Sequence, residues 1–408
     1  MTSETGVIIV GAGESAGSLA FSLRQQGYSR PIVLIGDESH PPYRRPPLSK
    51  AFLAGEVSAE SLYLRSADSY ARQNIELRLG LGVEAIDRAA RSVTLFDGEV
   101  LSYDRLVLAT GGHARRLLLP GADHPNVHYV RTITDIERLK KEFLPGKRLV
   151  VVGGGYIGLE VAAIGIKKGL GVTVIESLPR VLARVTAPEV SAFYERVHSE
   201  QGVKLLTHTG VEAFDGDPRV TGVRLGGGAI VPADIVVVGI GLVPNVELAT
   251  AAGLLVDNGI VVDALTRSSD ENIFAIGDCA NHENSFLGRR LRMESVASAV
   301  EQARICAAAI CEKPAPRSGP PWFWSDQYDL KLQMVGISQG YEQLAIRGDI
   351  NGRSFSAFYL HDGEIIAIDT VNRTGDFAVG KRLLAAHARA EVAQLADESF
   401  ELKSLLPA

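Results

Sequence analysis

Cysteine is scarce in this 408-residue chain, and its three cysteines are too few for a fold held by disulfides. They are Cys279, Cys306 and Cys311. No apolar run is long enough to cross a bilayer, since the most apolar stretch, 235–243, is flanked by Asp234 and Pro244. The N-terminus lacks the basic and apolar segments of a secretory signal. We therefore predict a cytoplasmic protein without a membrane partner.

Positive charge is not in excess either. The chain has 42 lysines and arginines against 48 aspartates and glutamates, for a net charge of -6. A protein whose surface binds nucleic acid is normally basic, so we expect no nucleic-acid partner. What is present is an ordinary globular composition, with 46% hydrophobic and 22% charged residues. A chain of this length predicts two or three domains, each with its own core.

The sequence contains an internal duplication. Residues 7–17 read VIIVGAGESAG, and residues 149–160 read LVVVGGGYIGLE. In each copy an apolar strand leads into closely spaced glycines and a helical pattern, and a second apolar strand then ends in an acid. The acids are Asp37 and Glu176. Two such units predict two dinucleotide-binding sites of the Rossmann type.

Each position of the motif has a mechanical reason. The first glycine permits the tight turn, the second lets the backbone approach a pyrophosphate, and a small third residue lets helix and strand pack closely. These residues are Gly11, Gly13 and Ala16 in the first copy and Gly153, Gly155 and Gly158 in the second. The acid binds ribose hydroxyls, and a carboxylate at Glu176 repels a 2′-phosphate, which favours NADH over NADPH. Arg180 and Arg184 come shortly after it, and we interpret them as a solvated helix face.

Three other segments are predicted to be strands that end in small-residue turns. They are RLVLATG (105–111), IVVVGIGLVPN (235–245) and NIFAIGDCA (272–280). Thr110, Gly111 and Gly241 lie in the first two turns. Asp278 stands at the end of the third strand, where ligands bind in open α/β sheets. In one interpretation Asp278 accepts hydrogen bonds from the polyol chain of a ligand. In the other it is the N-cap of the helix that follows, and the two roles are compatible.

Taken in order, these five segments resemble the two-dinucleotide flavoprotein reductases of the glutathione-reductase type. Three more segments sharpen the match: PPYRRPPLSKAFLAG (41–55), RMESVASAVEQAR (292–304) and WFWSDQYDLKLQMVG (322–336). With them, essentially the whole chain resembles the NADH-dependent ferredoxin reductases of cytochrome P450 and Rieske-type oxygenase systems. The chain departs from that pattern at Ala297 and Ser298, where proline and asparagine are frequent, and at His113, where arginine is common.

The resemblance implies an α/β fold with two Rossmann-like dinucleotide-binding domains, for FAD and NAD, and a C-terminal α/β domain with an antiparallel sheet. The implied boundaries are 1–115 and 246–319 for the FAD domain, 116–245 for the NAD domain and 320–408 for the C-terminal domain. In the last domain we predict the strands LKLQMVG, QLAIRG, SFSAFYL and EIIAIDTV and a helix at Phe377–Arg389. The stretch 313–321 contains four prolines and is predicted to be a linker.

The resemblance also implies the cofactors FAD and NADH. Beyond the motif glycines, Ala16 and the two acids, the residues that it places at the cofactors are Ser15, Arg44, Lys50, Val83, Thr110, Gly111, Arg131, Ile157, Glu160, Gly241, Asp278, Val296 and Trp324. Among these, Arg44 and Arg131 neutralise the FAD pyrophosphate or, in the alternative, form surface salt bridges. Val296 reaches the pyrimidine edge of the flavin. Trp324 flanks the ring, although it or Trp322 can equally be core.

The implied chemistry is that of the flavin, which takes a hydride and releases electrons singly, while the protein positions and tunes it. By the resemblance the catalytic residues are Lys50, beside flavin N5, and Glu160, near the nicotinamide, and we expect them to form an ion pair. Without the resemblance, Lys50 is a solvated lysine at a helix start and Glu160 a carboxylate favoured near a helix N-terminus. We predict no metal site.

The cysteines separate the chain from disulfide reductases, which place a redox pair shortly after the first ribose-binding acid. The corresponding segment here, HPPYRRPPLSK, contains no cysteine. Cys306 and Cys311 lie about 140° apart around a helix, so they occupy different faces. We predict that they pack in the interior.

The implied electron acceptor is an acidic [2Fe–2S] ferredoxin, which supplies a cytochrome P450 or a ring-hydroxylating oxygenase. A basic docking rim would steer it, and the candidates, which otherwise form a solvated face, are Arg289, Arg290, Arg292, Arg304 and Lys403. The chain itself is expected to be a monomer or a weak homodimer. Two alternatives stay open: a rubredoxin reductase or NADH oxidase, and a flavin-binding interaction protein resembling apoptosis-inducing factor.

Overall fold

The computed structural model describes residues 5–407, which divide into two units. The first unit consists of the described residues up to Arg45, Ala59–His113 and Leu242–Gly319. The second consists of Pro46–Ser58, Ala114–Gly241 and the described residues from Pro320 onward. Within residues 5–407, no helix is long and apolar enough to cross a membrane.

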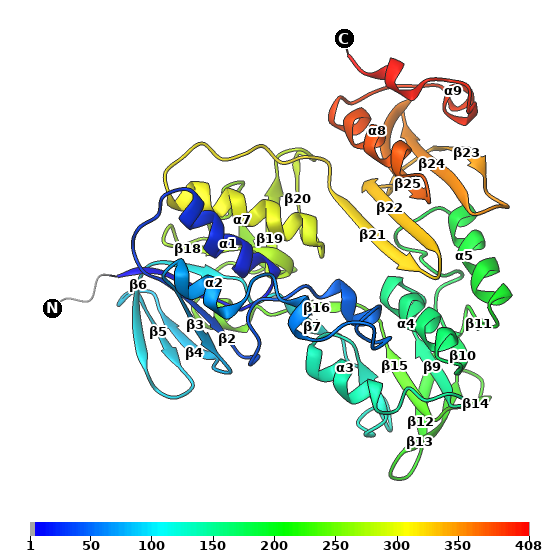
Figure 1. Ribbon diagram of the computed structural model, residues 1–408, viewed down its shortest axis with the longest axis horizontal. Coiled ribbons are helices and arrows are strands. Elements are labelled where there is room, and N and C mark those ends of the chain that lie inside the picture. Colours follow the sequence, from blue (N-terminus) through cyan, green and yellow to red (C-terminus); the bar gives the residue numbers. More distant parts are fainter. Residues whose placement is uncertain (1–4, 408) are drawn as a thin grey trace. The chain divides into compact units, whose positions relative to one another are not determined.

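The first unit is built on a parallel sheet that contains the strands of the first glycine motif. Its strands, in sheet order, are β3 (Ile75–Leu79), β2 (Ile32–Gly36), β1 (Gly6–Val10), β6 (Val100–Leu108) and β18 (Ile273–Ala275). All five residues of β1 are buried, as expected where a parallel sheet is covered on both faces. Figure 1 shows α1 (Glu14–Gln25) and α7 (Val296–Ile310) side by side along this sheet.

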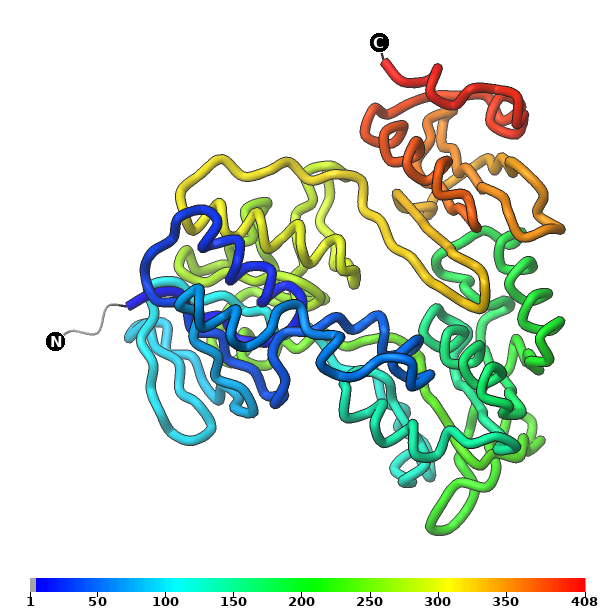
Figure 2. The backbone as a smooth tube through the Cα atoms, in the orientation of Figure 1, coloured from blue at the N-terminus to red at the C-terminus, as the bar shows by residue number. Residues whose placement is uncertain are grey.

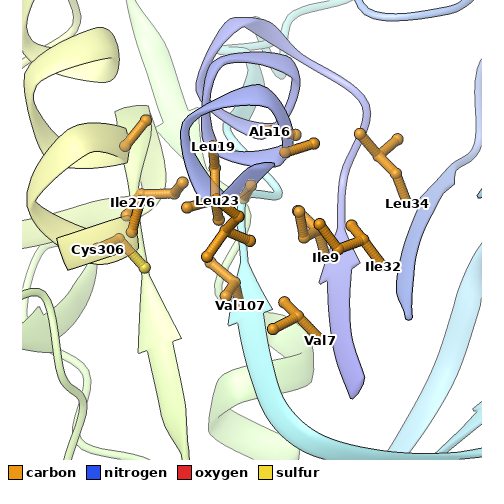
Figure 3. Packing of buried hydrophobic residues seen from close by; sticks show 14 of the residues in the cluster. Val7, Ile9, Ala16, Leu19, Leu23, Ile32, Leu34, Val107, Ile276 and Cys306 are labelled. Carbon is orange, nitrogen blue, oxygen red and sulfur yellow. The ribbon is translucent and has the colours of Figure 1, made fainter. Parts of the chain in front are cut away.

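One hydrophobic core lies between the sheet and this helix pair. Its labelled members in Figure 3 are Val7, Ile9, Ala16, Leu19, Leu23, Ile32, Leu34, Val107, Ile276 and Cys306. Each of them is at most 1% exposed. Burial of each large apolar side chain contributes roughly 1.5–3 kcal/mol, so this contact holds the first glycine motif firmly in place.

Smaller elements complete the first unit. They are α2 (Ala67–Arg72), β4 (Val83–Asp87), β5 (Ser92–Leu95), β7 (Gly112–Ala114), β16 (Leu242–Pro244), α6 (Glu247–Ala251), β17 (Ile260–Val262), β19 (Ala280–Asn284) and β20 (Arg289–Leu291), with the 3-10 helices η2 (Glu60–Leu62) and η3 (Gly277–Cys279). β4 and β5 continue the sheet in antiparallel fashion from the first half of β6. β17, β19 and β20 form a separate sheet, and β16 pairs with β7.

The second unit repeats the parallel sheet. Its strands, in sheet order, are β11 (Lys204–Leu206), β10 (Gly171–Ile175), β9 (Arg148–Val152), β15 (Ile235–Val238) and β8 (Val127–Tyr129). The other elements of this part are η1 (Pro46–Ser49), α3 (Ile133–Lys140), α4 (Tyr156–Lys167), α5 (Pro188–Glu200), β12 (Val211–Gly216), β13 (Val220–Leu225) and β14 (Ile230–Pro232). The two copies of the glycine motif found in the sequence therefore lie in two separate parallel sheets.

An antiparallel sheet comes next in the same unit. Its strands, in sheet order, are β21 (Trp322–Gln327), β22 (Leu330–Gly336), β25 (Glu364–Val371), β24 (Ser354–His361) and β23 (Gln343–Asp349). The orange part of the tube in Figure 2 traces these strands. They confirm the predicted C-terminal strands, and the predicted linker 313–321 contains neither helix nor strand.

The predicted helix Phe377–Arg389 is wrong at both ends. The helix is α8 (Thr374–Ala385), and α9 (Val392–Ala396) and η4 (Leu402–Leu405) come after it. It ends early because Arg389 forms a β-bridge with Glu364, which needs extended backbone. The finer division into FAD, NAD and C-terminal domains stays a prediction.

Candidate functional site

The first glycine motif forms the turn between β1 and α1. Gly11 has φ +111°, and a Cβ there would lie 2.2 Å from the carbonyl oxygen of Ala109. Gly13 is the N-cap of α1, and a Cβ there would meet no atom within 4 Å. Gly11 is therefore required by the fold itself. Gly13 leaves room that the fold does not use, as close approach of a ligand to the backbone requires.

The close packing predicted at the third motif position lies one residue later. Ala16 is fully buried, and its methyl group fits in the core. At Gly17, a Cβ would lie 2.8 Å from side-chain atoms of both Leu64 and Pro42. A side chain at position 17 would therefore clash with the segments that contain Pro42 and Leu64.

Two acids come directly after β2, and they differ in their contacts. The side chain of Asp37, the predicted ribose ligand, is exposed. Glu38 accepts hydrogen bonds from the Tyr43 hydroxyl at 2.6 Å and from Arg45 at 2.7 Å. Glu38 therefore holds the segment that comes after it. The sequence did not predict this role, because it depends on Tyr43 and Arg45 folding back onto the strand end.

The turn after β6 is tied to a residue that the sequence analysis did not select. Thr110 Oγ1 donates to the carbonyl oxygen of Asn245 at 2.7 Å, and Asn245 Nδ2 donates to the Thr110 carbonyl at 2.9 Å. His113 Nδ1 lies 2.6 Å from Asn245 Oδ1. Gly111 has φ +62°, which allows the turn. Asn245 thus joins two of the predicted strand-end turns.

Ser15 and Asp278 come from distant segments that pack together. Ser15 is buried in the first turn of α1, and a Cβ on Gly277 would lie 2.7 Å from its Oγ. Asp278 lies within η3, whose N-cap is Ile276, so the capping interpretation of Asp278 is wrong. Its other interpretation, as a polyol ligand, stays a prediction. The remaining predicted residues of this unit are Arg44, which is exposed, Val83, which begins β4, and Val296, which begins α7.

Glu14 is a feature of the first motif that the sequence analysis missed. It lies in the first turn of α1, and its Oε2 is buried without a hydrogen-bond partner. Burial raises the pKa of Glu14, and the charge of Arg44 opposes that rise. A negative charge at a helix N-terminus is favourable for the helix but unfavourable for a second anion there, so Arg44 also offsets Glu14 for an incoming phosphate.

The second glycine motif forms the turn between β9 and α4. Gly153 has φ +109°, and a Cβ there would lie 2.4 Å from the carbonyl oxygen of Gly239. Gly155 is the N-cap of α4, and a Cβ there would meet no atom within 4 Å. At Gly158 a Cβ would lie 2.0 Å from the carbonyl oxygen of Gly153. The turn at Gly153 and the close packing at Gly158 match their predicted roles, and Gly155 leaves the room that its predicted role requires.

Glu176 comes directly after β10 and folds back onto the glycine turn. Its Oε2 accepts a hydrogen bond from the backbone N–H of Gly154 at 2.7 Å, and its Oε1 accepts one from Leu178 at 2.8 Å. The predicted ribose ligand therefore stands at the turn and also holds it. This contact links the two halves of the motif directly.

The arginines after Glu176 do not lie on a helix face, contrary to our interpretation. The segment that contains Arg180 and Arg184 is a series of turns, because α5 starts only at Pro188. Arg180 donates to Ser191 Oγ at 2.5 Å and to the Ala183 carbonyl at 3.1 Å, whereas Arg184 is exposed. Arg180 is thus a structural residue.

Three predicted residues of the second unit lie on the rim of its sheet or at helix starts. Ile157, in the first turn of α4, is 45% exposed although it is a large apolar side chain. Gly241 is exposed and has φ +108°. Arg131 precedes α3, whose N-cap is Thr132.

Lys50 and Glu160 form the ion pair that the sequence analysis predicted. Lys50 Nζ lies 2.7 Å from Glu160 Oε2, and Glu160 is only 4% exposed. Two serine hydroxyls also donate to this carboxylate, Ser49 to Oε2 at 2.5 Å and Ser325 to Oε1 at 2.6 Å. The four residues come from η1 and the residue after it, from α4 and from β21, which the tertiary structure brings together.

Burial and these donors act in opposite directions on Glu160. Burial raises the pKa of Glu160, and Lys50, Ser325 and Ser49 act to lower it. A buried carboxylate is costly unless it is paired and hydrogen-bonded, and here both oxygens have donors. Lys50 Nζ also donates to the Pro46 carbonyl at 3.2 Å, which fixes the ammonium on a second side. The alternative interpretation of Lys50, as a solvated lysine, is therefore wrong.

Strand β21 has two different faces. Ser325 and Gln327 are buried, at 0% and 1% exposure, on one face. Trp322 and Trp324 stack on the other, with ring centroids 5.5 Å apart. Phe377 of α8 packs edge-on against Trp322 at 5.8 Å. The alternation of a strand thus separates a polar face from an indole face, and both tryptophans keep partly exposed rings.

Both glycine motifs fit a dinucleotide. Neither Gly13 nor Gly155 offers a side chain to cap its helix, so the first N–H groups of α1 and α4 remain available to an anion. A Cβ at either glycine would meet no atom within 4 Å, which leaves room for a pyrophosphate to approach the backbone. An acid stands at the end of the second strand in each case. The residues present therefore fit FAD or NAD at either motif.

The three cysteines are free thiols, and two of them are fully buried. Burial raises the pKa of Cys279 and raises that of Cys306 to about 12. Cys311 is the C-cap of α7 and is partly buried. A thiol with a raised pKa stays protonated and is a poor nucleophile, which agrees with a packing role for the buried cysteines.

Two of the five residues of the predicted basic rim have partners inside the first unit. Arg290 donates to the Asn281 carbonyl at 2.8 Å, and Arg292 pairs with Glu294 at 2.7 Å. Arg289 and Arg304 are exposed. Two of the four arginines of this unit are therefore structural. Lys403, in the second unit, is exposed.

The chain belongs to the pyridine nucleotide-disulphide oxidoreductase family, whose model matches residues 5–303. The reductase C-terminal family matches residues 322–406. These two families account for both parallel sheets and for the antiparallel sheet of the second unit.

Relatives share almost the full length of the chain. Putidaredoxin reductase CamA of Pseudomonas putida is 48% identical over 414 residues, which cover 100% of this chain and 98% of the relative. The ferredoxin reductase subunit of 5,5'-dehydrodivanillate O-demethylase of Sphingobium sp. is 45% identical, with 98% of each chain covered. Among solved structures, a covalent putidaredoxin reductase–putidaredoxin complex matches with a TM-score of 0.96 at 47% identity, again covering 98% of each chain.

Proposed function

We propose that this protein is an FAD-dependent NADH:ferredoxin reductase, which supplies electrons through a [2Fe–2S] ferredoxin to a cytochrome P450 or a ring-hydroxylating oxygenase. The observation that carries the proposal is the ion pair between Lys50 and Glu160, which is buried on the helix of the second dinucleotide motif. The family and the full-length relatives support the same class of activity. We further propose a cytoplasmic location and a monomer or weak homodimer.

When bound, FAD accepts a hydride from NADH and passes electrons singly to an iron–sulfur acceptor. We assign the first motif to FAD, in a domain formed by 1–115 and 246–319, and the second to NADH, in a domain formed by 116–245, with the C-terminal domain 320–408 after them. The residues proposed for FAD are Gly11, Gly13, Ser15, Ala16, Asp37, Arg44, Val83, Thr110, Gly111, Arg131, Asp278, Val296 and Trp324. Those proposed for NADH are Gly153, Gly155, Ile157, Gly158, Glu176 and Gly241.

Lys50 and Glu160 are the proposed catalytic pair. Lys50 offers a fixed ammonium, held by Glu160 and by the Pro46 carbonyl. Such a preorganised charge costs no reorganisation when negative charge develops nearby. Glu160, which is 4% exposed, keeps the ammonium in place. No side chain of this cluster has to gain or lose a proton for electrons to pass.

The test is an anaerobic titration of the purified flavin-containing protein with NADH and, separately, with NADPH, following flavin absorbance. We expect stoichiometric bleaching by NADH and much slower bleaching by NADPH, because the Glu176 carboxylate repels a 2′-phosphate. A [2Fe–2S] ferredoxin should then be reduced catalytically, and a rubredoxin more slowly. Faster transfer to rubredoxin would identify the alternative reductase. If neither nucleotide reduced the bound flavin, a flavin-dependent binding protein would replace this proposal.

A further inference from the structure

The Glu160 carboxylate is the end point of a longer chain of polar contacts. Lys50 and Ser49 donate to Oε2. Among residues 5–407, Ser325 is the one donor to Oε1, at 2.6 Å. Because a buried carboxylate is costly without donors, the direction in which the Ser325 hydroxyl points matters for Glu160.

The chain continues from Ser325 through three more side chains. Gln327 Nε2 lies 3.2 Å from Ser325 Oγ, and Gln327 Oε1 lies 2.8 Å from His198 Nε2. The Tyr328 hydroxyl lies 3.0 Å from His198 Nδ1. Ser325 and His198 are 0% exposed and Gln327 is 1% exposed. Water therefore does not compete for these groups, and each contact depends on the next.

Two arrangements of hydrogens satisfy every link. An ionised Glu160 only accepts, so Ser325 donates to it and accepts from the Gln327 amide. Gln327 Oε1 then accepts from His198 Nε2–H, and His198 Nδ1 accepts from Tyr328. A neutral amide in place of the carboxylate can donate to Ser325, which allows every hydrogen bond to run in the opposite direction. Ser325 then donates to Gln327, whose amide is turned over and donates to His198 Nε2, and the hydrogen of His198 lies on Nδ1.

We propose that Ser325, Gln327 and His198 form a hydrogen-bond relay that positions the Glu160 carboxylate beside Lys50 and whose direction is set by the charge of Glu160. The three are positioning residues, since they act through Glu160. The relay needs a neutral imidazole in both directions, and burial lowers the pKa of His198 to about 4. The existence and direction of the relay do not depend on the proposed function; only the effect of the relay on the rate of flavin reduction does.

The direction of the relay is tested by NMR on the flavin-containing protein labelled with ¹⁵N-histidine, because ring nitrogen shifts distinguish the two tautomers. We expect the Nε2–H tautomer for His198, with the signal assigned by its loss in His198→Gln. In Glu160→Gln, Lys50 and Ser49 attract the amide oxygen, so the NH₂ group faces Ser325. That variant should show the Nδ1–H tautomer.

The control in this experiment is His282, which is buried in the other unit with its Nε2 3.3 Å from the Ala264 carbonyl. Its tautomer should be the same in both proteins. A His198 tautomer that does not change in Glu160→Gln overturns the relay, whether or not the protein is a ferredoxin reductase.

The positioning role is tested by the rate of flavin reduction by NADH. Ser325→Ala should lower this rate about tenfold, with little change in the KM for NADH, whereas Ser325→Thr, which keeps the hydroxyl, should restore it. Ser356→Ala is the matched control, because Ser356 is 0% exposed in the same sheet and donates to Asp376 at 2.7 Å. Its rate should equal that of the wild type.

If Ser325→Ala does not fold, Gln327→Met provides the same test, since methionine has a similar shape without hydrogen-bonding groups. An unchanged rate in a folded variant overturns the positioning role. If NADH fails to reduce the flavin of the wild type, the proposed function fails instead, and the tautomer experiment still decides the relay.

Discussion

The two glycine motifs of this protein share a backbone but differ in their side chains. Gly11 and Gly153 have nearly the same φ, +111° and +109°, and each packs against a backbone carbonyl, of Ala109 and Gly239. Four strands of each sheet have equivalent orders, β3-β2-β1-β6 and β11-β10-β9-β15. The turn is repeated because sterics allow few ways to pass from a buried strand into a helix.

The side chains on the two helices after these turns are placed differently. Glycine is required at position 158 in the second motif, whereas the first motif accepts Ala16 and requires Gly17 instead. The first has Glu14 in its first helical turn, with an unpartnered carboxylate oxygen. The second has Glu160, with donors on both oxygens, at the position where the first has Ser18. Backbone geometry is thus common to both, and charge placement is specific to each.

The largest effect is expected from Gly158→Ala. A Cβ 2.0 Å from the Gly153 carbonyl oxygen cannot be relieved by a rotamer change. We expect a loss of about 3 kcal/mol or more in the free energy of unfolding, measured in urea, and a raised KM for NADH.

Gly155→Ala is its matched control. A Cβ there meets no atom of the protein within 4 Å, so stability should change by less than about 1 kcal/mol while the KM for NADH still rises. Equal stability losses in the two variants would contradict the distinction between a packing glycine and a ligand-facing one.

The next largest effect is expected from Lys50→Met, which tests the charge placement of the second motif. Loss of the ammonium should slow flavin reduction by NADH on the order of 10²-fold in stopped-flow measurements. Ser18→Ala, at the position equivalent to Glu160, should leave this rate unaltered. Unchanged reduction kinetics in Lys50→Met would remove Lys50 from the mechanism.

A smaller effect is expected when the two strand-end acids are compared. Glu176→Ala should raise the KM for NADH about tenfold, because the variant loses a charged ribose acceptor that also holds the Gly154 turn. Asp37→Ala should instead weaken FAD retention, measured as flavin released on dilution, with the KM for NADH unchanged. An unaltered KM in Glu176→Ala would mean that the ribose is held by other groups.

The smallest effect is expected from Glu14→Gln and depends on pH. Burial raises the pKa of Glu14 in the folded protein above its ordinary value of 4.5. The folded protein therefore binds a proton at Glu14 more readily than the unfolded chain does. The contribution of this group to the free energy of unfolding falls as the pH rises from 4.5 through the pKa of the folded protein. The neutral variant should therefore be more stable than the wild type at pH 7, by less than about 1 kcal/mol because the side chain is partly exposed. Its advantage should disappear below pH 4.5. If the free energies of unfolding of Glu14→Gln and the wild type differed by the same amount at every pH, the effect would come from packing and not from charge.

Local patterns in the sequence predicted much of the fold. Both strand–glycine–helix units, the acids after their second strands and the C-terminal strands were found at or near their observed bounds, because periodicity and steric preference act over a few residues. Helix α8 was misplaced at both ends, and its C-terminal end was missed because the bridge between Arg389 and Glu364 involves residues distant in sequence.

The sequence by itself thus determined the backbone framework and the presence of two dinucleotide motifs, and resemblance added the pairing of Lys50 with Glu160. Only the tertiary structure decided which groups surround that pair. Ser325 reaches Glu160 across 165 positions of sequence and His198 reaches Gln327 across 129. In the first unit, only the structure showed that Arg290 donates to the Asn281 carbonyl and Arg292 to the Asp278 carbonyl. The contacts around the Lys50–Glu160 pair depend on how α4, α5 and β21 pack, and packing is set by shape and burial summed over the whole chain, which no local pattern contains.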